Sequence, residues 1–258
     1  MFSYSYRRAD CFPNRRGLGA APPATNGLLN NLKAYWSFNL TGGLEGVPEF
    51  GTVSLFAVAP ASPTASGLIS NAITCSPWGD TAACYFPTSN LSTLVFNQDV
   101  SISVWAKPNT SSNNYYFGTL FQVTNSIGDS LLLAFEDNQI HFGGFVNGGN
   151  ESFNYIPPSG WTAGDWIHIV LTHNASTQIL KLYMNGVLVA ASTARPAYTS
   201  ATGAEVDLLG DFLTGPFQNG SFGGDLDEFG IWQKLFTSTD VTNLYNSGAG
   251  LASTAFQT

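Results

Sequence analysis

Three acidic residues near the C-terminal end are the first candidates for chemistry. Asp225 and Asp227 lie two residues apart, and Glu228 follows directly. In an extended strand, residues i and i+2 point to the same face, so the two aspartates would lie side by side. Two carboxyl groups about 5–5.5 Å apart can hydrolyse a glycosidic bond with retention of configuration. Phe229 takes the next position on that face, so the strand offers only two acids for this work.

The histidines and the glycine pairs of the sequence do not belong to a recognisable catalytic motif. His141, His168 and His173 come without the Gly-x-Ser-x-Gly turn that would present a nucleophilic serine. The glycine pairs at 143–144, 148–149 and 223–224 lead into no helix, so they indicate turns rather than a phosphate-binding loop. The sequence therefore predicts a protein that is not an enzyme.

Sugar binding is the chemistry that the loop composition favours. Sugar sites combine flat aromatic faces with amide groups that form hydrogen bonds. Two segments have this composition, Asn113-Asn-Tyr-Tyr116 and 147–155, and Trp161 lies in a loop. Each aromatic residue could equally be a packed loop residue. The predicted carbohydrate-binding residues are Asn113, Tyr115, Tyr116, Asn150 and Trp161.

Charge is unevenly distributed along the 258 residues, which carry a net charge of −8. The first 16 residues hold four arginines and one acid, a net charge of +3, whereas the remaining chain carries −11. A basic segment on an acidic body is attracted to anionic surfaces, including a neighbouring copy, and the body would repel nucleic acid. The alternative is a solvated tail without a role.

Residues 1–30 are predicted to form an extended basic arm, and residues 31–258 a single folded body. The arm begins with aromatic residues that alternate with serine, a period of two that suits a strand laid on another sheet. The residues predicted to bind a partner protein, such as a second copy of the chain, are Phe2, Tyr4, Tyr6, Arg7, Arg8, Arg15 and Arg16.

The elements that must position these residues are strands. Charged residues make up only 10% of the chain, which argues against long helices, while 27 glycines suit many tight turns. Val100–Ala106 alternates apolar residues with serine and Trp105, and Asn185-Gly186 is a typical two-residue hairpin turn. Residues 238–246 predict one short helix, with Gly248 just beyond its end. The fold class is all-β, an antiparallel two-sheet jelly-roll sandwich.

Three blocks of sequence resemble laminin-G-like domains of the concanavalin A-like lectin/glucanase superfamily. The segment 99–108 is similar to the strand with a Trp and a Lys-Pro pair, and 164–189 to the hairpin block around Asn185-Gly186. The segment 224–248 resembles the closing block with its Asp-Glu pair. The blocks come in the family's order over about residues 32–250, but Asn39-Leu-Thr-Gly-Gly43 replaces the usual opening turn.

The resemblance carries expectations about ligands. It makes a calcium ion compatible with Asp227, because one carboxylate and loop carbonyls can hold Ca²⁺ weakly. The alternative is that Asp227 and Glu228 accept backbone amides between the last strand and the helix. Relatives that hydrolyse β-glucans carry Glu-x-Asp-x-x-Glu, and this chain lacks it. We therefore expect no cofactor, with calcium as the one exception.

The family mostly works outside cells, yet no apolar run that would form a secretory signal follows the arginines before Gly17, and no stretch is long enough to span a membrane. Cys75 and Cys84 bracket a short loop and could form a disulfide or remain thiols. We expect a virion structural protein, a capsid decoration or tail-fibre component that displays a lectin-like sandwich. Its expected partners are other virion proteins, which the arm would bind, and cell-surface glycans. The alternatives are an extracellular carbohydrate-binding module and a β-glucan hydrolase.

Overall fold

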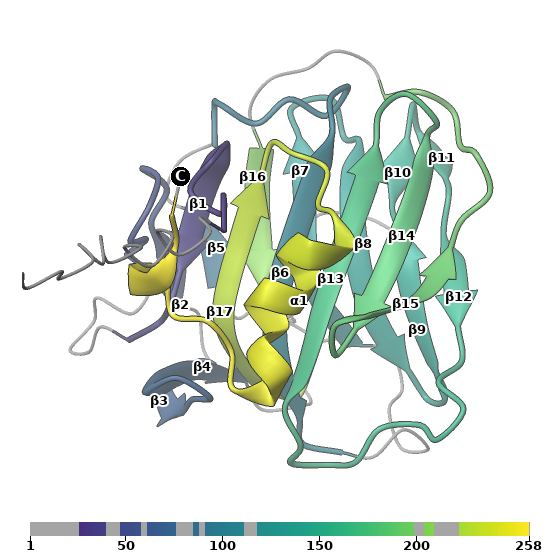
Figure 1. Cartoon of the computed structure of the whole chain (residues 1–258). Helices are drawn as coiled ribbons and strands as arrows, with labels where there is room; N and C mark the ends of the chain where they lie inside the picture. The colour runs from purple at the N-terminus through teal and green to yellow at the C-terminus, as the bar shows by residue number, and fades with distance from the viewer. Residues whose placement is uncertain are drawn as a thin grey trace, which may run out of the picture.

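The computed structural model describes residues 26–39, 47–57, 61–75, 85–87, 91–110, 118–198, 204–208 and 222–257. These residues form two antiparallel sheets packed face to face, as the sequence predicts (Figure 1). Residues 1–25 of the basic arm, the loop with Asn113 and Cys84 lie outside the described residues.

Sheet A has the strand order β15-β14-β13-β6-β17-β4-β3, and β1 also pairs with β17. Its members are β1 (Leu32–Trp36), β3 (Ala61–Ser66), β4 (Asn71–Cys75), β6 (Val100–Pro108), β13 (Ile167–Asn174), β14 (Ile179–Met184), β15 (Val187–Ala191) and β17 (Gly224–Trp232).

Sheet B has the order β12-β9-β8-β7-β16-β5-β2, and a small hairpin of β10 and β11 lies outside both sheets. Its members are β2 (Leu55–Ala57), β5 (Tyr85–Pro87), β7 (Gly118–Asn125), β8 (Ser130–Glu136), β9 (Gln139–Gly143), β12 (Phe153–Tyr155) and β16 (Ala204–Leu208). The hairpin consists of β10 (Phe145–Val146) and β11 (Gly149–Asn150).

The main core lies between the sheets. In β6 every second residue is apolar, and these residues all point to the space between the sheets. Val100, Ile102 and Val104 are buried in this core together with apolar residues from both sheets. The alternate residues of β6 point to the outer face of sheet A. Apolar side chains on one face of each strand therefore hold the sandwich together, because they leave water together.

The outer face of sheet A carries a second core beneath the C-terminal helix α1 (Ser238–Tyr245), which Figure 1 shows lying across β6, β13 and β17. Trp232 and Tyr35 are buried there, and Trp105 stacks against Tyr245 at 5.8 Å between ring centroids. Thr237 caps the helix and forms a reciprocal capping box with Asp240. The chain after α1 continues in two short 3₁₀ turns, Asn246–Gly248 and Ser253–Ala255.

His168 lies in this second core and has a structural role. Its Nε2 is 2.9 Å from the hydroxyl of Ser103, and its ring lies against Trp105. Burial lowers the pKa of His168 to about 3, because the low-dielectric surroundings disfavour the charged ring. The ring is therefore neutral over the physiological pH range.

The packed body begins before residue 31. Leu28 is fully buried, and its carbonyl oxygen accepts a hydrogen bond of 2.7 Å from the indole of Trp232. The backbone N–H of Leu29 donates to the carbonyl of Gln257. The sequence assigns residues 26–30 to the arm, but in the structure they pack against the folded body. Within the described ranges, no helix is long and apolar enough to cross a membrane.

Candidate functional site

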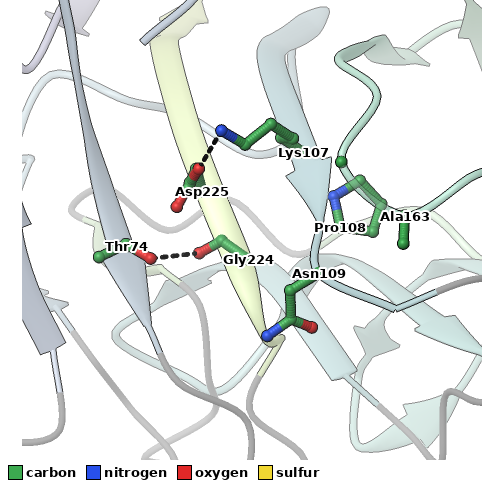
Figure 2. A pocket seen from close by; sticks show the side chains of 8 residues that line it. Thr74, Lys107, Pro108, Asn109, Ala163, Gly224 and Asp225 are labelled. Atoms are coloured by element: carbon green, nitrogen blue, oxygen red, sulfur yellow. Dashed lines mark hydrogen bonds and ion pairs between the residues drawn. The ribbon is translucent and has the colours of Figure 1, made fainter. Parts of the chain in front are cut away.

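A polar pocket of about 400 Å³ opens where β4, β6 and β17 run side by side, next to the loop that precedes β13 (Figure 2). Its volume is near the lower end of the ~300–1,000 Å³ typical of small-molecule pockets. The residues that line it are Thr74, Lys107, Pro108, Asn109, Ala163, Gly164, Gly224 and Asp225.

An ion pair forms the floor of this pocket. Asp225 lies directly opposite Lys107 on β6 and opposite Thr74 on β4, so the three side chains share the outer face of sheet A. The Lys107 ammonium is 2.6 Å from a carboxylate oxygen of Asp225, and Figure 2 shows the two groups pointing toward one another. Their side chains are 26% and 13% exposed, so both can be reached by a ligand.

An aromatic side chain stands beside the pair. The Lys107 ammonium lies 5.1 Å from the ring centroid of Trp166, which directly precedes β13 and is half-buried. A cation over an indole face is attracted by the negative potential of the ring. Lys107 is therefore held between Asp225 and Trp166 instead of ranging freely through solvent.

Backbone hydrogen bonds fix the pocket walls. The N–H of Gly164 donates to the carbonyl of Pro108 at 2.8 Å, and the N–H of Asn109 donates to Gly223 at 3.0 Å. Any residue other than glycine at position 224 would force the chain to shift, because its Cβ atom would lie 2.3 Å from the Lys107 carbonyl oxygen. The side chains of the pocket thus stand on a rigid frame, which reduces the entropy lost on binding a ligand.

The pocket can offer both kinds of hydrogen-bonding group. Lys107 donates, the Asp225 carboxylate accepts, and the exposed Asn109 amide does both. The Thr74 hydroxyl donates to the Gly224 carbonyl at 3.3 Å and keeps its own capacity to accept. Such a mixture suits a ligand rich in hydroxyl groups, since each hydroxyl donates one hydrogen bond and accepts others.

Asp227 lies two residues along β17 from the pocket and is fully buried. One carboxylate oxygen accepts the N–H of Ile69 at 2.9 Å, and the other accepts the N–H of Glu228 at 2.8 Å. Burial raises the pKa of Asp227 to about 7, although these amides favour the charged form. Asp227 thus ties the last strand to the turn that precedes β4.

Glu228 is buried next to Asp227 and accepts a short hydrogen bond from the Tyr35 hydroxyl on β1. Burial first, and then the neighbouring Asp227 carboxylate, raise the pKa of Glu228 to about 9. Its backbone has a φ of +51° where β17 bulges between Asp227 and Gly230. Glu228 therefore holds its proton at neutral pH and serves the packing of β1 on β17.

These contacts do not fit a calcium ion at Asp227. Both of its oxygens are already directed at backbone amides, and Ca²⁺ takes about six to eight oxygen ligands. Across the ranges that the structure describes, no group of three or more His, Cys, Asp or Glu side chains could hold a metal ion. We derive no role for a metal from this arrangement.

Two of the five residues that the sequence singles out for sugar binding are described, Trp161 and Asn150, and neither lines the pocket. Trp161 is only 6% exposed, packs edge-on against Phe135 and donates its indole N–H to Thr110, so no sugar can stack on its ring. It instead anchors the loop that carries Ala163 and Gly164. Asn150 is exposed on the β10–β11 hairpin, where its amide oxygen accepts the Ser152 hydroxyl.

The remaining predicted residues lie outside the described part of the chain and stay predictions. They are Asn113, Tyr115 and Tyr116 of the loop, and Phe2, Tyr4, Tyr6, Arg7, Arg8, Arg15 and Arg16 of the arm. The same holds for a disulfide between Cys75 and Cys84, since neither side chain is described.

Sequence reasoning missed three residues of the pocket, Thr74, Lys107 and Asn109. Lys107 and Asn109 flank Pro108 at the end of a predicted strand, and the sequence pattern marks Asp225 only as a candidate hydrolytic acid. The feature of the sequence that could have indicated them is a polar residue near the end of an otherwise apolar strand, such as Lys107 on β6 and Asp225 on β17. Only the pairing of those strands shows that the two ends meet.

A second polar hollow of about 600 Å³ lies at the opposite end of β6. Asn97, Gln98 and Ser176 are among its lining residues, together with Gln233 and Lys234. Gln233 forms three hydrogen bonds to Val95 and Asp99, so its amide serves the loop itself. Lys234 pairs with Asp240, which is not among the described residues that line the hollow. The hollow therefore presents no donor–acceptor pair of the kind that Lys107 and Asp225 form, which makes it the weaker candidate.

The chain belongs to the concanavalin A-like lectin/glucanases superfamily. Residues 79–242 match the Laminin_G_3 family model of that description, which is more than half of the chain. This match confirms the family resemblance that the three sequence blocks indicate. No curated protein sequence matches the chain.

Solved structures share the fold at low sequence identity. The binding domain of botulinum neurotoxin serotype D is 15% identical, with a TM-score of 0.62 over 84% of this chain and 51% of that domain. A serotype D ligand-binding domain in complex with N-acetylneuraminic acid is 15% identical, with a TM-score of 0.55 over 76% of this chain and 46% of that one. This chain thus spans about half the length of the toxin binding domains.

A similar domain of nearly the same size belongs to an extracellular arabinanase. Domain 4 of the family GH43 arabinanase AbnA from Geobacillus stearothermophilus, solved in complex with arabinotriose, is 18% identical. The TM-score is 0.57, and the match covers 86% of this chain and 98% of that domain. At these identities, the likeness shows that the fold is shared and nothing further.

Proposed function

We propose that this protein is a glycan-binding module and that the Lys107–Asp225 pocket is its binding site. The observation that carries the proposal is the ion pair at the pocket floor, accessible and surrounded by Thr74, Asn109 and the neighbouring Trp166. Membership of a lectin/glucanase superfamily supports it. So do the two structural neighbours that were solved with sugars, arabinotriose in one and N-acetylneuraminic acid in the other.

Binding is a better proposal than hydrolysis. Retaining and inverting glycosidases both need two carboxyl groups that flank the scissile bond. Asp225 is paired with Lys107, and Asp227 is fully buried with both oxygens directed at amides. These contacts are the reason that we favour binding over hydrolysis by Asp225 and Asp227.

The virion hypothesis draws no support from the comparisons, which contain toxin binding domains and a domain of a secreted enzyme. It depends on the arm, whose residues lie outside the described part of the chain. A glycan-binding domain can serve in many kinds of larger assembly, so the proposal concerns the sandwich and its pocket.

The test is binding of the full chain to an array of plant, bacterial and animal glycans. We expect one class of sugar to bind, and we expect Lys107→Met to weaken that binding about tenfold or more, since a tenfold loss corresponds to a single good hydrogen bond of about 1.4 kcal/mol. Lys181→Met is the matched control, because Lys181 is an exposed strand lysine of β14. Equal loss in both variants, or a wild-type chain that binds no glycan, would overturn the proposal.

A further inference from the structure

The charge balance of the Lys107–Asp225 pocket points to the class of sugar that it takes, an inference that rests on the proposed function. We infer that the pocket binds neutral glycans through a pair of hydroxyls on adjacent ring carbons, and that it disfavours acidic sugars.

Among the described residues that line the pocket, the one cation is already neutralised. Lys107 lies 2.6 Å from Asp225, and the other lining residues are uncharged. Asp165 is an exposed acid in the loop beside Trp166, and the whole chain has a net charge of −8. A sialic acid, uronic acid or sulfated sugar would bring a negative charge to a place where the described lining residues offer no unpaired positive side chain. Proteins that recognise such groups supply unpaired arginine or lysine side chains.

The spacing between the Lys107 donor and the Asp225 acceptor favours a ligand with two neighbouring hydroxyls. The Lys107 ammonium has three N–H donors and uses one toward Asp225, while each carboxylate oxygen has more than one lone pair. Two adjacent groups, one that donates and one that accepts, therefore face the ligand about a hydrogen-bond length apart. Hydroxyls on neighbouring ring carbons have a comparable separation, so one can accept from Lys107 while the other donates to Asp225.

The size and the rigidity of the pocket favour a short glycan. A pocket of about 400 Å³ suits one or two sugar rings rather than a long stretch of chain. Asn109 is exposed next to the floor and can bond a ring that extends beyond it. Since the hydrogen bonds at Gly164 and Asn109 fix the walls, specificity comes from the preformed ion pair.

The experiment is isothermal titration of the full chain with neutral and acidic oligosaccharides of matched length. Neutral probes are the trisaccharides of arabinose, xylose, galactose, glucose and mannose, and the acidic probes are 3′-sialyllactose and trigalacturonate. We expect the best neutral probe to bind about tenfold or more tightly than either acidic probe, with little dependence on salt. Tighter binding of an acidic probe, weakened by salt, would overturn this inference and leave the proposed function standing.

A substitution that frees the lysine gives the sharper result. Asp225→Asn keeps the shape of the side chain and removes its charge, so Lys107 becomes an unpaired cation. We expect this variant to lose neutral-sugar affinity about tenfold and to gain salt-sensitive binding of trigalacturonate. The double variant Asp225→Asn with Lys107→Met should lose both. If Asp225→Asn, shown by its melting curve to be folded, binds neutral sugars as the wild type does, the inference is wrong. If no probe binds the wild type, the proposed function fails with it.

Discussion

The folded protein is expected to lose stability as the pH rises from about 6.5 to about 9. The reason lies in the two buried acids of β17, Asp227 and Glu228. Burial raises their pKa values to about 7 and about 9, against ordinary values of 3.8 and 4.5. Below about pH 4, both acids are protonated in the folded and in the unfolded chain, so neither reduces stability there.

Up to about pH 6.5 the folded and unfolded states bind nearly equal numbers of protons. The buried His168 and His173, whose pKa values burial lowers to about 3 and about 4, take up protons on unfolding while the two acids release theirs. Above about pH 6.5 the folded protein still keeps Asp227 protonated to about pH 7 and Glu228 to about pH 9, so unfolding releases protons and a rising pH favours it. For Asp227 alone, the change from 3.8 to about 7 corresponds to about 4 kcal/mol, fully lost above pH 7.

Glu228→Gln tests this account most cleanly. Glutamine resembles the protonated acid and can still accept the Tyr35 hydroxyl. We expect the variant to be more stable than the wild type at pH 7 by up to roughly 3 kcal/mol, and equally stable at pH 4. Urea unfolding at a series of pH values measures both quantities.

Asp137→Asn is the control for the pH series, because Asp137 is an exposed acid in the turn between β8 and β9. Its stability curve should follow that of the wild type. A Glu228→Gln variant with the wild-type slope between pH 4 and pH 9, or with lower stability at pH 7, would show that Glu228 is ionised in the folded protein.

The second large effect is expected from Gly224→Ala at the pocket floor. A Cβ at this position would lie 2.3 Å from the Lys107 carbonyl and 2.7 Å from the Phe222 ring, and the backbone has a φ of +153°. Both the clash and the backbone conformation are unfavourable, so we expect a loss of stability on the order of 3 kcal/mol. Because β6 must move to make room, glycan binding should weaken as well.

Gly128→Ala separates the clash from the backbone conformation. Gly128 has a φ of +87°, and nothing lies within 4 Å of a Cβ placed there. This variant should lose only about 1 kcal/mol and keep full binding. If urea unfolding gave equal losses for both glycines, close packing around Gly224 would not be what fixes the pocket floor.

Much of the fold follows from local sequence patterns. The alternation in Val100–Ala106 correctly assigns one face to the core and the other to the outer side, because a strand has a period of two. Asn185 and Gly186 both have positive φ, as the predicted hairpin turn requires. The predicted helix lies at Ser238–Tyr245 and ends at Asn246 in the left-handed conformation.

The candidate site could not be predicted in the same way, because strands distant in the sequence build it. Nothing near Lys107 in the chain indicates that Asp225 lies opposite, and this fact depends on β17 pairing with β6. Trp161 is the opposite case, in which the local sequence suggests a binding residue and the fold buries it. A tryptophan in a loop rich in glycine and proline resembles a binding platform, but the loop folds back and buries the ring against Phe135.

The most direct test of the central claim is to locate a bound sugar on the protein. A crystal structure of the full chain with the tightest-binding trisaccharide would show its contacts atom by atom. We predict a sugar ring whose adjacent hydroxyls bond Lys107 and Asp225, with Asn109 and Trp166 at its edge. A sugar held instead in the hollow at Asn97 and Gln98, or on the β10–β11 hairpin, would contradict the account.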